Sequence, residues 1–205
     1  MRLTLRVGLV SLVLLLCATP QASAEWQIKP FLGVTFAGST TFVHPADAVA
    51  SPHVAFGLSG IWLGEILGAE ADVGYVRGFF GDQNVIVGNI APVVGSSAVT
   101  LTGNVVVALP RRLTQYTLRP YFVGGAGLIR ASIDPGVGGG GLQVASTRPG
   151  MDLGGGVTGF LSKRVGLGWD VRHFRSIGTG EERGLSFGPE QLSFWRANMA
   201  LAIRY

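Results

Sequence analysis

Charge is scarce in this chain of 205 residues. Asp, Glu, Lys and Arg together make up 14% of the sequence, against roughly a quarter in an average globular domain. Lysine occurs only at Lys29 and Lys163, and the mean hydropathy is +0.41. Disorder requires low hydrophobicity and high net charge, so this composition excludes a disordered chain. The charged surface expected of a soluble cytosolic domain is missing as well.

Cysteine is almost absent, and the single one, Cys17, lies in a segment with the pattern of a secretory signal peptide. That pattern comprises a positive start, a short apolar run, a break and a small-residue cleavage site. The parts are Arg2 and Arg6, the 12-residue run Val7–Ala18, Pro20, and Ala22-Ser23-Ala24. The run is shorter than the roughly 20 residues of a spanning helix. Residues 1–24 are therefore predicted to be a signal peptide and residues 25–205 the mature barrel domain; an uncleaved anchor and a lipoprotein signal are the alternatives.

Removal of residues 1–24 has two consequences for the chemistry of the chain. The mature domain has no cysteine, which excludes disulfides, a thiolate nucleophile and cysteine-ligated metals. Lys plus Arg falls from 16 to 14 while Asp plus Glu stays at 12, so the net charge falls from +4 to +2. The sequence pI of 9.7 is thus no argument for nucleic-acid binding. No cofactor is predicted.

Long apolar runs are also missing after residue 24, where no segment has the roughly 18 uninterrupted apolar residues of a transmembrane helix. Glycine, in contrast, is abundant, with 32 residues. Each glycine inside a helix costs about 1 kcal/mol relative to alanine, so a helix bundle is excluded. In lipid, only helices and closed barrels satisfy every backbone hydrogen bond. An exported, hydrophobic and glycine-rich chain without such helices therefore favours a closed β-barrel.

Eight segments show the alternation of apolar and polar residues that is typical of strands. They cover residues 26–37, 52–62, 67–79, 97–109, 117–131, 148–161, 164–177 and 191–205. The connections are alternately long (38–51, 80–96, 132–147, 178–190) and short (63–66, 110–116, 162–163). This asymmetry is typical of bacterial outer-membrane barrels. The predicted fold is all-β, an eight-stranded antiparallel up-and-down transmembrane β-barrel. Residues 85–94 are unusually apolar for a loop, which leaves open whether strands extend above the membrane.

The same alternation assigns side chains either to the lipid or to the interior. Charged residues occur at eight interior positions, namely Lys29, Glu70, Asp72, Asp152, Asp170, Arg172, Arg196 and Arg204. Four are basic and four acidic, and buried charges persist only when they are paired. A lumen ion-pair network is therefore predicted, in which Arg172 and Arg196 pair with Asp170, Glu70 or Asp72. Such a network either rigidifies the closed barrel or lines a narrow polar path.

Two motifs connect the chain with a known superfamily. Residues 119–128 read RPYFVGGAGL, and GGGV at 154–157 is followed by RVGL at 164–167 and DVR at 170–172. With these motifs the whole mature chain resembles the small outer-membrane β-barrels that include the barrel of outer-membrane protein A and the W- and X-type barrels. The terminal Tyr205, with apolar residues at every second position before it, resembles the signal by which the outer-membrane assembly machinery recognises a last strand. These are fold motifs and imply little about activity.

Other candidate sites carry weak signals. Gly136, Gly138 and Gly141 fit G-x-G-x-x-G, but no helix follows them, so a surface loop is the better interpretation. His173 and Ser176 invite comparison with the lipid A deacylases, yet a spacing of three puts them on opposite faces of a strand.

Histidines and aromatic residues add little to these candidates. His44 and His53 flank the first long loop without a third ligand, so no metal site is predicted. Aromatic residues near predicted strand ends are interpreted as interfacial anchors. They are Trp26, Trp62, Tyr75, Tyr116, Trp195 and Tyr205.

The sequence therefore predicts a non-enzymatic outer-membrane protein with a structural or surface-interaction role, in which the long loops form the contact surface. The alternative is a narrow channel for small hydrophobic or polar solutes, as the W-type barrels suggest. Outer-membrane lipid, lipopolysaccharide and the assembly machinery are the expected partners. Nucleic acid is not, and the sequence names no extracellular ligand.

The interior position of Asp170 yields a test of the strand assignment. Removing one partner of a buried pair costs about 3–5 kcal/mol, whereas an exposed pair is worth about 0–1 kcal/mol. Asp170→Ala is therefore expected to lower the urea midpoint of unfolding markedly more than Glu181→Ala in the last long loop. Equal midpoints would contradict the interior assignment of Asp170.

Overall fold

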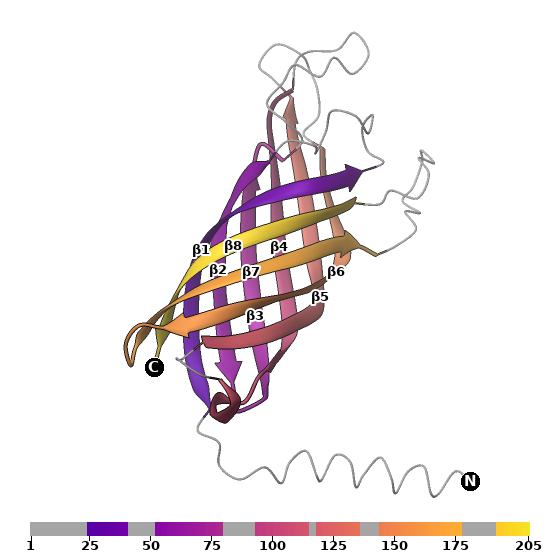
Figure 1. Ribbon diagram of the computed structural model, residues 1–205. Coiled ribbons are helices and arrows are strands. Elements are labelled where there is room, and N and C mark those ends of the chain that lie inside the picture. Colours follow the sequence, from indigo (N-terminus) through magenta and orange to yellow (C-terminus); the bar gives the residue numbers. More distant parts are fainter. Residues whose placement is uncertain (1–23, 41–51, 80–92, 115–117, 136–143, 178–191) are drawn as a thin grey trace, which may run out of the picture.

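The computed structural model describes residues 24–40, 52–79, 93–114, 118–135, 144–177 and 192–205. Eight strands account for nearly all of them (Figure 1). The strands are β1 (Glu25–Thr40), β2 (His53–Leu63), β3 (Leu67–Arg77), β4 (Val93–Ala108), β5 (Leu118–Pro135), β6 (Val144–Phe160), β7 (Val165–Ser176) and β8 (Leu192–Arg204). A single 3-10 turn, η1 (Arg111–Leu113), lies between β4 and β5. The described residues include no helix with the length and hydropathy of a membrane span.

The strands form one closed antiparallel barrel in sequence order, and β1 pairs with β8 to complete it. This confirms the predicted fold class. The β1–β8 register shifts between Phe36 and Ser39, where Ala37 has a φ of 49°. The β4–β5 register also shifts, between Val93 and Gly95. The remaining seams are regular ladders, such as Arg119↔Thr158 to Ile133↔Val144 between β5 and β6. Closure leaves no free sheet edge around the body of the barrel.

Alternating side chains give the barrel an apolar exterior and a mixed interior. Outward-facing hydrophobic residues are widely exposed, including Trp26 at 61% and Phe122 at 76%. The residues between them, such as Gln27 and Val123, are buried inside. Trp26 pairs directly with Trp62 across β1 and β2, near the end of the barrel that carries both described termini. This is the reverse of a soluble domain, whose apolar residues would face inward.

Strand lengths differ from the prediction at the end with the long connections. β4 begins at Val93, β5 runs to Pro135 and β6 begins at Val144. The third long connection is therefore shorter than predicted and comprises residues 136–143. The adjacent strands continue pairing there, as Ser132↔Ala145 shows. Residues 85–92 lie outside the described part. A membrane-spanning strand needs only about 9–11 residues, so β4, β5 and β6 form one wall taller than β2, β3 and β7 (Figure 1).

The interior is layered along the barrel axis. An apolar cluster, the upper cluster, fills the end near the long connections. It consists of Ala55, Val76, Phe79, Ala98, Ile129, Phe174, Leu192 and Phe194. A second one, the lower cluster, lies toward the termini and consists of Ile61, Leu63, Val106, Ala108, Tyr121 and Val123. Charged and polar side chains occupy the middle layer.

Inward glycines let β6 lie against large lumen side chains. A Cβ added at Gly154 would come within 2.8 Å of both Cα and Cγ of Arg172 and would also strike the Val171 carbonyl. At Gly103, on the outer face of β4, a Cβ would meet no atom within 4 Å. Glycine at 154 is thus a packing requirement, whereas glycine at 103 is not.

We expect Gly154→Ala to destabilise the barrel by about 1–3 kcal/mol, the usual cost of overpacking. Gly103→Ala is the matched control and should be neutral, because the added methyl group points to open space. Urea unfolding in detergent, followed by the loss of the folded band on an unheated gel, measures both. A Gly154→Ala midpoint equal to that of Gly103→Ala would contradict the close packing of β6 against Arg172.

Candidate functional site in the barrel lumen

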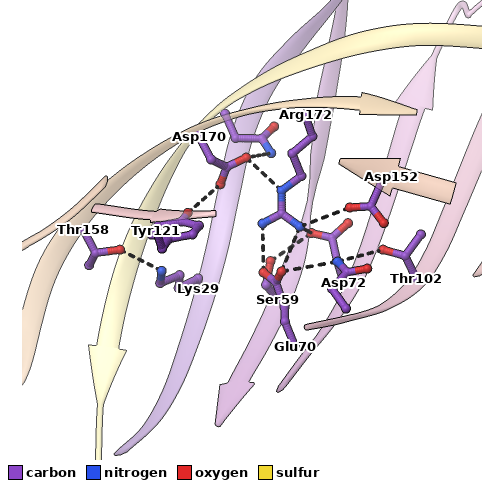
Figure 2. Close-up of polar contacts among 12 residues, drawn as sticks. Lys29, Ser59, Glu70, Asp72, Thr102, Tyr121, Asp152, Thr158, Asp170 and Arg172 are labelled. Atoms are coloured by element: carbon purple, nitrogen blue, oxygen red, sulfur yellow. Dashed lines mark hydrogen bonds and ion pairs between the residues drawn. The ribbon is translucent and has the colours of Figure 1, made fainter. Parts of the chain in front are cut away.

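The guanidinium of Arg172 lies at the centre of the lumen, where Figure 2 shows acidic side chains converging on it. Arg172 alternates with outward residues on β7 and is only 1% exposed. Its two terminal nitrogens donate to the two carboxylate oxygens of Glu70 on β3, each at 2.9 Å. Its Nε donates to Oδ1 of Asp170 at 3.1 Å. A forked pair of this kind is the strongest geometry for an arginine and a carboxylate.

A second buried cation, Arg196 on β8, lies directly across the strand pair from Arg172. It donates to Oδ1 of Asp72 at 2.8 Å. Its guanidinium carbon also lies 4.5 Å from the ring centre of Phe31 and 4.7 Å from that of Phe174. Two adjacent buried arginines are therefore compatible because each has its own carboxylate and the aromatic rings provide further attraction.

Neutral side chains complete the hydrogen bonding of these carboxylates. Ser59 donates to Asp72 at 2.9 Å, and Asn104 donates to Glu70 at 3.3 Å. Tyr121 and Asn198 donate to Asp170 at 3.2 and 3.0 Å. Sequence analysis did not single out these four residues. Alternation assigns these four residues to the interior. Because a buried carboxylate needs several hydrogen-bond donors, that position could have identified them as its partners.

Asp152 has the weakest position of the lumen carboxylates. Its nearest guanidinium nitrogen, on Arg172, is 3.8 Å away. Neither of its buried oxygens has a hydrogen-bond donor among the described residues. The forked contact with Glu70 uses both terminal nitrogens of Arg172, which leaves Asp152 with a longer charge interaction.

Two residues predicted for the network lie apart from it. Lys29 donates to Thr158 at 2.8 Å and lies 4.8 Å from the ring centre of Tyr121. Within the described part of the chain Lys29 takes part in no ion pair. Arg204 faces inward, but it lies near the C-terminal end of β8, where it is 24% exposed and pairs with Glu25 at 3.5 Å.

Other candidates from the sequence have structural roles where the structure describes them. Ser176 is buried and accepts a hydrogen bond from the backbone of Leu192 at 2.9 Å, while His173 packs on Trp195 with ring centres 4.9 Å apart. In the described ranges no three His, Cys, Asp or Glu side chains are placed to hold a metal ion. His44, Gly136, Gly138, Gly141 and Tyr116 lie outside the described residues.

The described side chains leave little free space beside Lys29. Near Lys29 and Tyr121 a cavity of about 10 Å³ remains, which is at the lower limit for one water molecule. Polar groups in this layer form salt bridges and hydrogen bonds with each other across opposite walls. The arrangement of these described side chains is suited to holding the barrel closed.

The sequence matches no known family model and no curated protein. Solved structures, in contrast, match over most of their length. Neisserial surface protein A (NspA) has a TM-score of 0.60 and 13% identity, with 88% of this chain and 97% of the other covered. The outer-membrane protein OprG of Pseudomonas aeruginosa has a TM-score of 0.55 and 13% identity, with 90% and 97% covered. The fold is that of the small outer-membrane β-barrels.

A third small outer-membrane barrel with this fold is Ail, the attachment invasion locus protein of Yersinia pestis, solved in complex with the heparin analogue sucrose octasulfate. Its TM-score is 0.50 at 11% identity, with 88% of this chain and 99% of Ail covered. These comparisons confirm the resemblance that the motifs indicated. At such low identity they establish the architecture alone.

Glu70 and Asp152 face the same guanidinium in different ways, which gives a matched pair of substitutions. Glu70→Gln removes the charge that receives both terminal nitrogens of Arg172, and it should cost about 3–5 kcal/mol of unfolding free energy. Asp152→Asn removes a carboxylate without hydrogen-bond donors, and it should cost less than about 1 kcal/mol or stabilise the barrel.

Equilibrium unfolding in urea, with refolding from the same detergent, measures both variants. Equal losses for Glu70→Gln and Asp152→Asn would show that the contact geometry around Arg172 does not control stability.

Proposed function

We propose that the protein is a non-enzymatic barrel of the outer membrane with a structural or surface-interaction role. The observation that carries this proposal is the filled lumen. The upper cluster, the ion pairs around Arg172 and the lower cluster follow one another along the axis. An eight-stranded barrel is just wide enough for side chains to fill. This argues against the alternative role, a narrow channel for small solutes.

The outer face supports a location in lipid. Exposed hydrophobic side chains surround the barrel, and the aromatic pair Trp26 and Trp62 lies at the end near the termini. Toward the other end, Arg77, Arg130 and Arg175 are exposed on the outer faces of β3, β5 and β7. Guanidinium groups bind phosphate well. We assign these three arginines to contacts with the phosphates of lipopolysaccharide in the outer leaflet.

The tall wall formed by β4, β5 and β6 supports a role outside the membrane. These strands have 16, 18 and 17 residues, whereas β2 and β3 have 11 each. The additional residues of β4, β5 and β6 extend the paired backbone beyond the strand length that is needed to cross a bilayer. Two of the similar structures are described as a surface protein and an attachment protein. Contact with a partner outside the cell is the same class of role.

Delivery to the outer membrane is the remaining part of the proposal. Tyr205 is 80% exposed at the end of β8, where the assembly machinery would bind it as the last-strand signal. Export would require the signal peptide, residues 1–24, which lies almost entirely outside the described residues.

A purified, folded preparation from the membrane fraction tests location and role together. We expect the N-terminal residue to be Glu25 and planar bilayers containing the protein to carry no steady current. The Glu70→Gln variant, which lacks the ion pair between Arg172 and Glu70, is measured in the same bilayers for comparison. Retention of Met1 or recovery from the soluble periplasm would contradict the location, and steady unitary currents from the unmodified protein would favour the channel.

A further inference from the structure

The barrel mouth beside the termini contains a cavity that none of the preceding roles uses. Its volume is about 390 Å³, and four of its lining residues are cationic: Arg111, Arg119, Lys163 and Arg204. They come from η1, from β5, from the β6–β7 turn and from β8, which are separate parts of the sequence. Thr114 and Ser162 add hydroxyl groups to the same wall. We call this cavity the basic mouth.

Carboxylates balance only part of this charge. Glu25 forms ion pairs with both Arg111 and Arg204. Glu65 lies close enough to Arg119 to attract it electrostatically. Burial, and then the neighbouring Arg204 guanidinium, lower the pKa of Arg111 below its ordinary value. Like charges therefore lie close together around an open space.

Two of the cations, Arg119 and Arg204, are held in place rather than freely solvated. Arg204 donates from Nε to the carbonyl of Lys163 at 2.8 Å, and its guanidinium lies 4.3 Å from the ring centre of Phe160. Arg119 donates to the carbonyls of Gly64 and Glu65 at 2.7 and 2.8 Å. Side chains that are already ordered lose little entropy when a ligand binds.

We propose that the basic mouth binds a phosphate-bearing anion. The four cations and the two carboxylates, Glu25 and Glu65, leave an excess of two positive charges, which suits a multivalent anion better than a single carboxylate. Planar guanidinium groups match the oxygens of phosphate in a forked geometry. In the proposed topology this end of the barrel faces the periplasm, although binding itself does not depend on that orientation.

A soluble anion fits the mouth better than a lipid headgroup does. Arg119, Phe160 and Arg204 occupy interior positions of their strands, whereas residues such as Leu118 and Leu201 on these strands face outward. A headgroup in the plane of the bilayer would approach the outer side of the same wall. Both sources present the same phosphate chemistry, so the experiment has to separate them.

Pyrophosphate is the soluble probe, measured by titration calorimetry on the folded mature chain in a non-ionic detergent at low ionic strength. Lys163→Glu is the main variant, because Lys163 is exposed in a turn and can change without loss of the barrel. Ala145→Glu, which adds a negative charge at an exposed position of β6 at the opposite end of the barrel, is the control. The heat-dependent shift in gel mobility verifies that each variant is folded.

We expect pyrophosphate to bind to the unmodified protein and to Ala145→Glu with equal affinity. Lys163→Glu should weaken binding by about tenfold or more, since it turns an attraction into a repulsion. The protein could instead bind only vesicles that contain phosphatidylglycerol and not vesicles of phosphatidylcholine alone. If Lys163→Glu abolishes that binding, the bound phosphate belongs to a lipid headgroup. Equal weakening in both variants, or no binding of either probe, would overturn the proposal.

Discussion

The contact between Arg172 and Glu70 joins opposite walls of the barrel, and the arrangement of the interior depends on it. With eight strands, side chains from β3 and β7 meet at the axis, so every group placed there has to fit against another. Buried charges are stable in such a space only if their hydrogen bonds are satisfied. Ser59, Asn104, Tyr121 and Asn198 supply those bonds. Above and below this layer, the apolar side chains of the upper and lower clusters contribute to the filling of the barrel.

Most of the architecture could be predicted from alternation, because a strand period of two assigns every residue to the inside or the outside. Alternation assigns Arg172, Asp170 and Glu70 to the interior, and in the structure all three are buried there. Height along the axis could not be predicted, since it depends on the stagger between neighbouring strands. Arg204 faces inward as expected, yet it lies at the mouth instead of the centre. Lys29, on a neighbouring strand, is level with Thr158 and Tyr121 and does not reach a carboxylate.

The filled interior and the varied exterior divide the barrel into parts with different tasks. The middle layer and its two apolar clusters stabilise closure, and a solute path would have to disrupt all three. Binding is therefore expected at the ends, where the tall wall of β4, β5 and β6 and the basic mouth lie. The two ends differ in character. One presents extended backbone beyond the bilayer, and the other presents a concave, positively charged opening.

The cross-lumen contacts also constrain the order in which the chain can assemble. Arg172 and Glu70 are 102 residues apart, Arg196 and Asp72 are 124 apart, and Lys29 and Thr158 are 129 apart. An open sheet, before β1 meets β8, would carry these charges on a face without partners. Contacts of such long range form late and slow the folding of a chain. The barrel should therefore close in one cooperative step, with partly closed sheets too costly to accumulate in the bilayer.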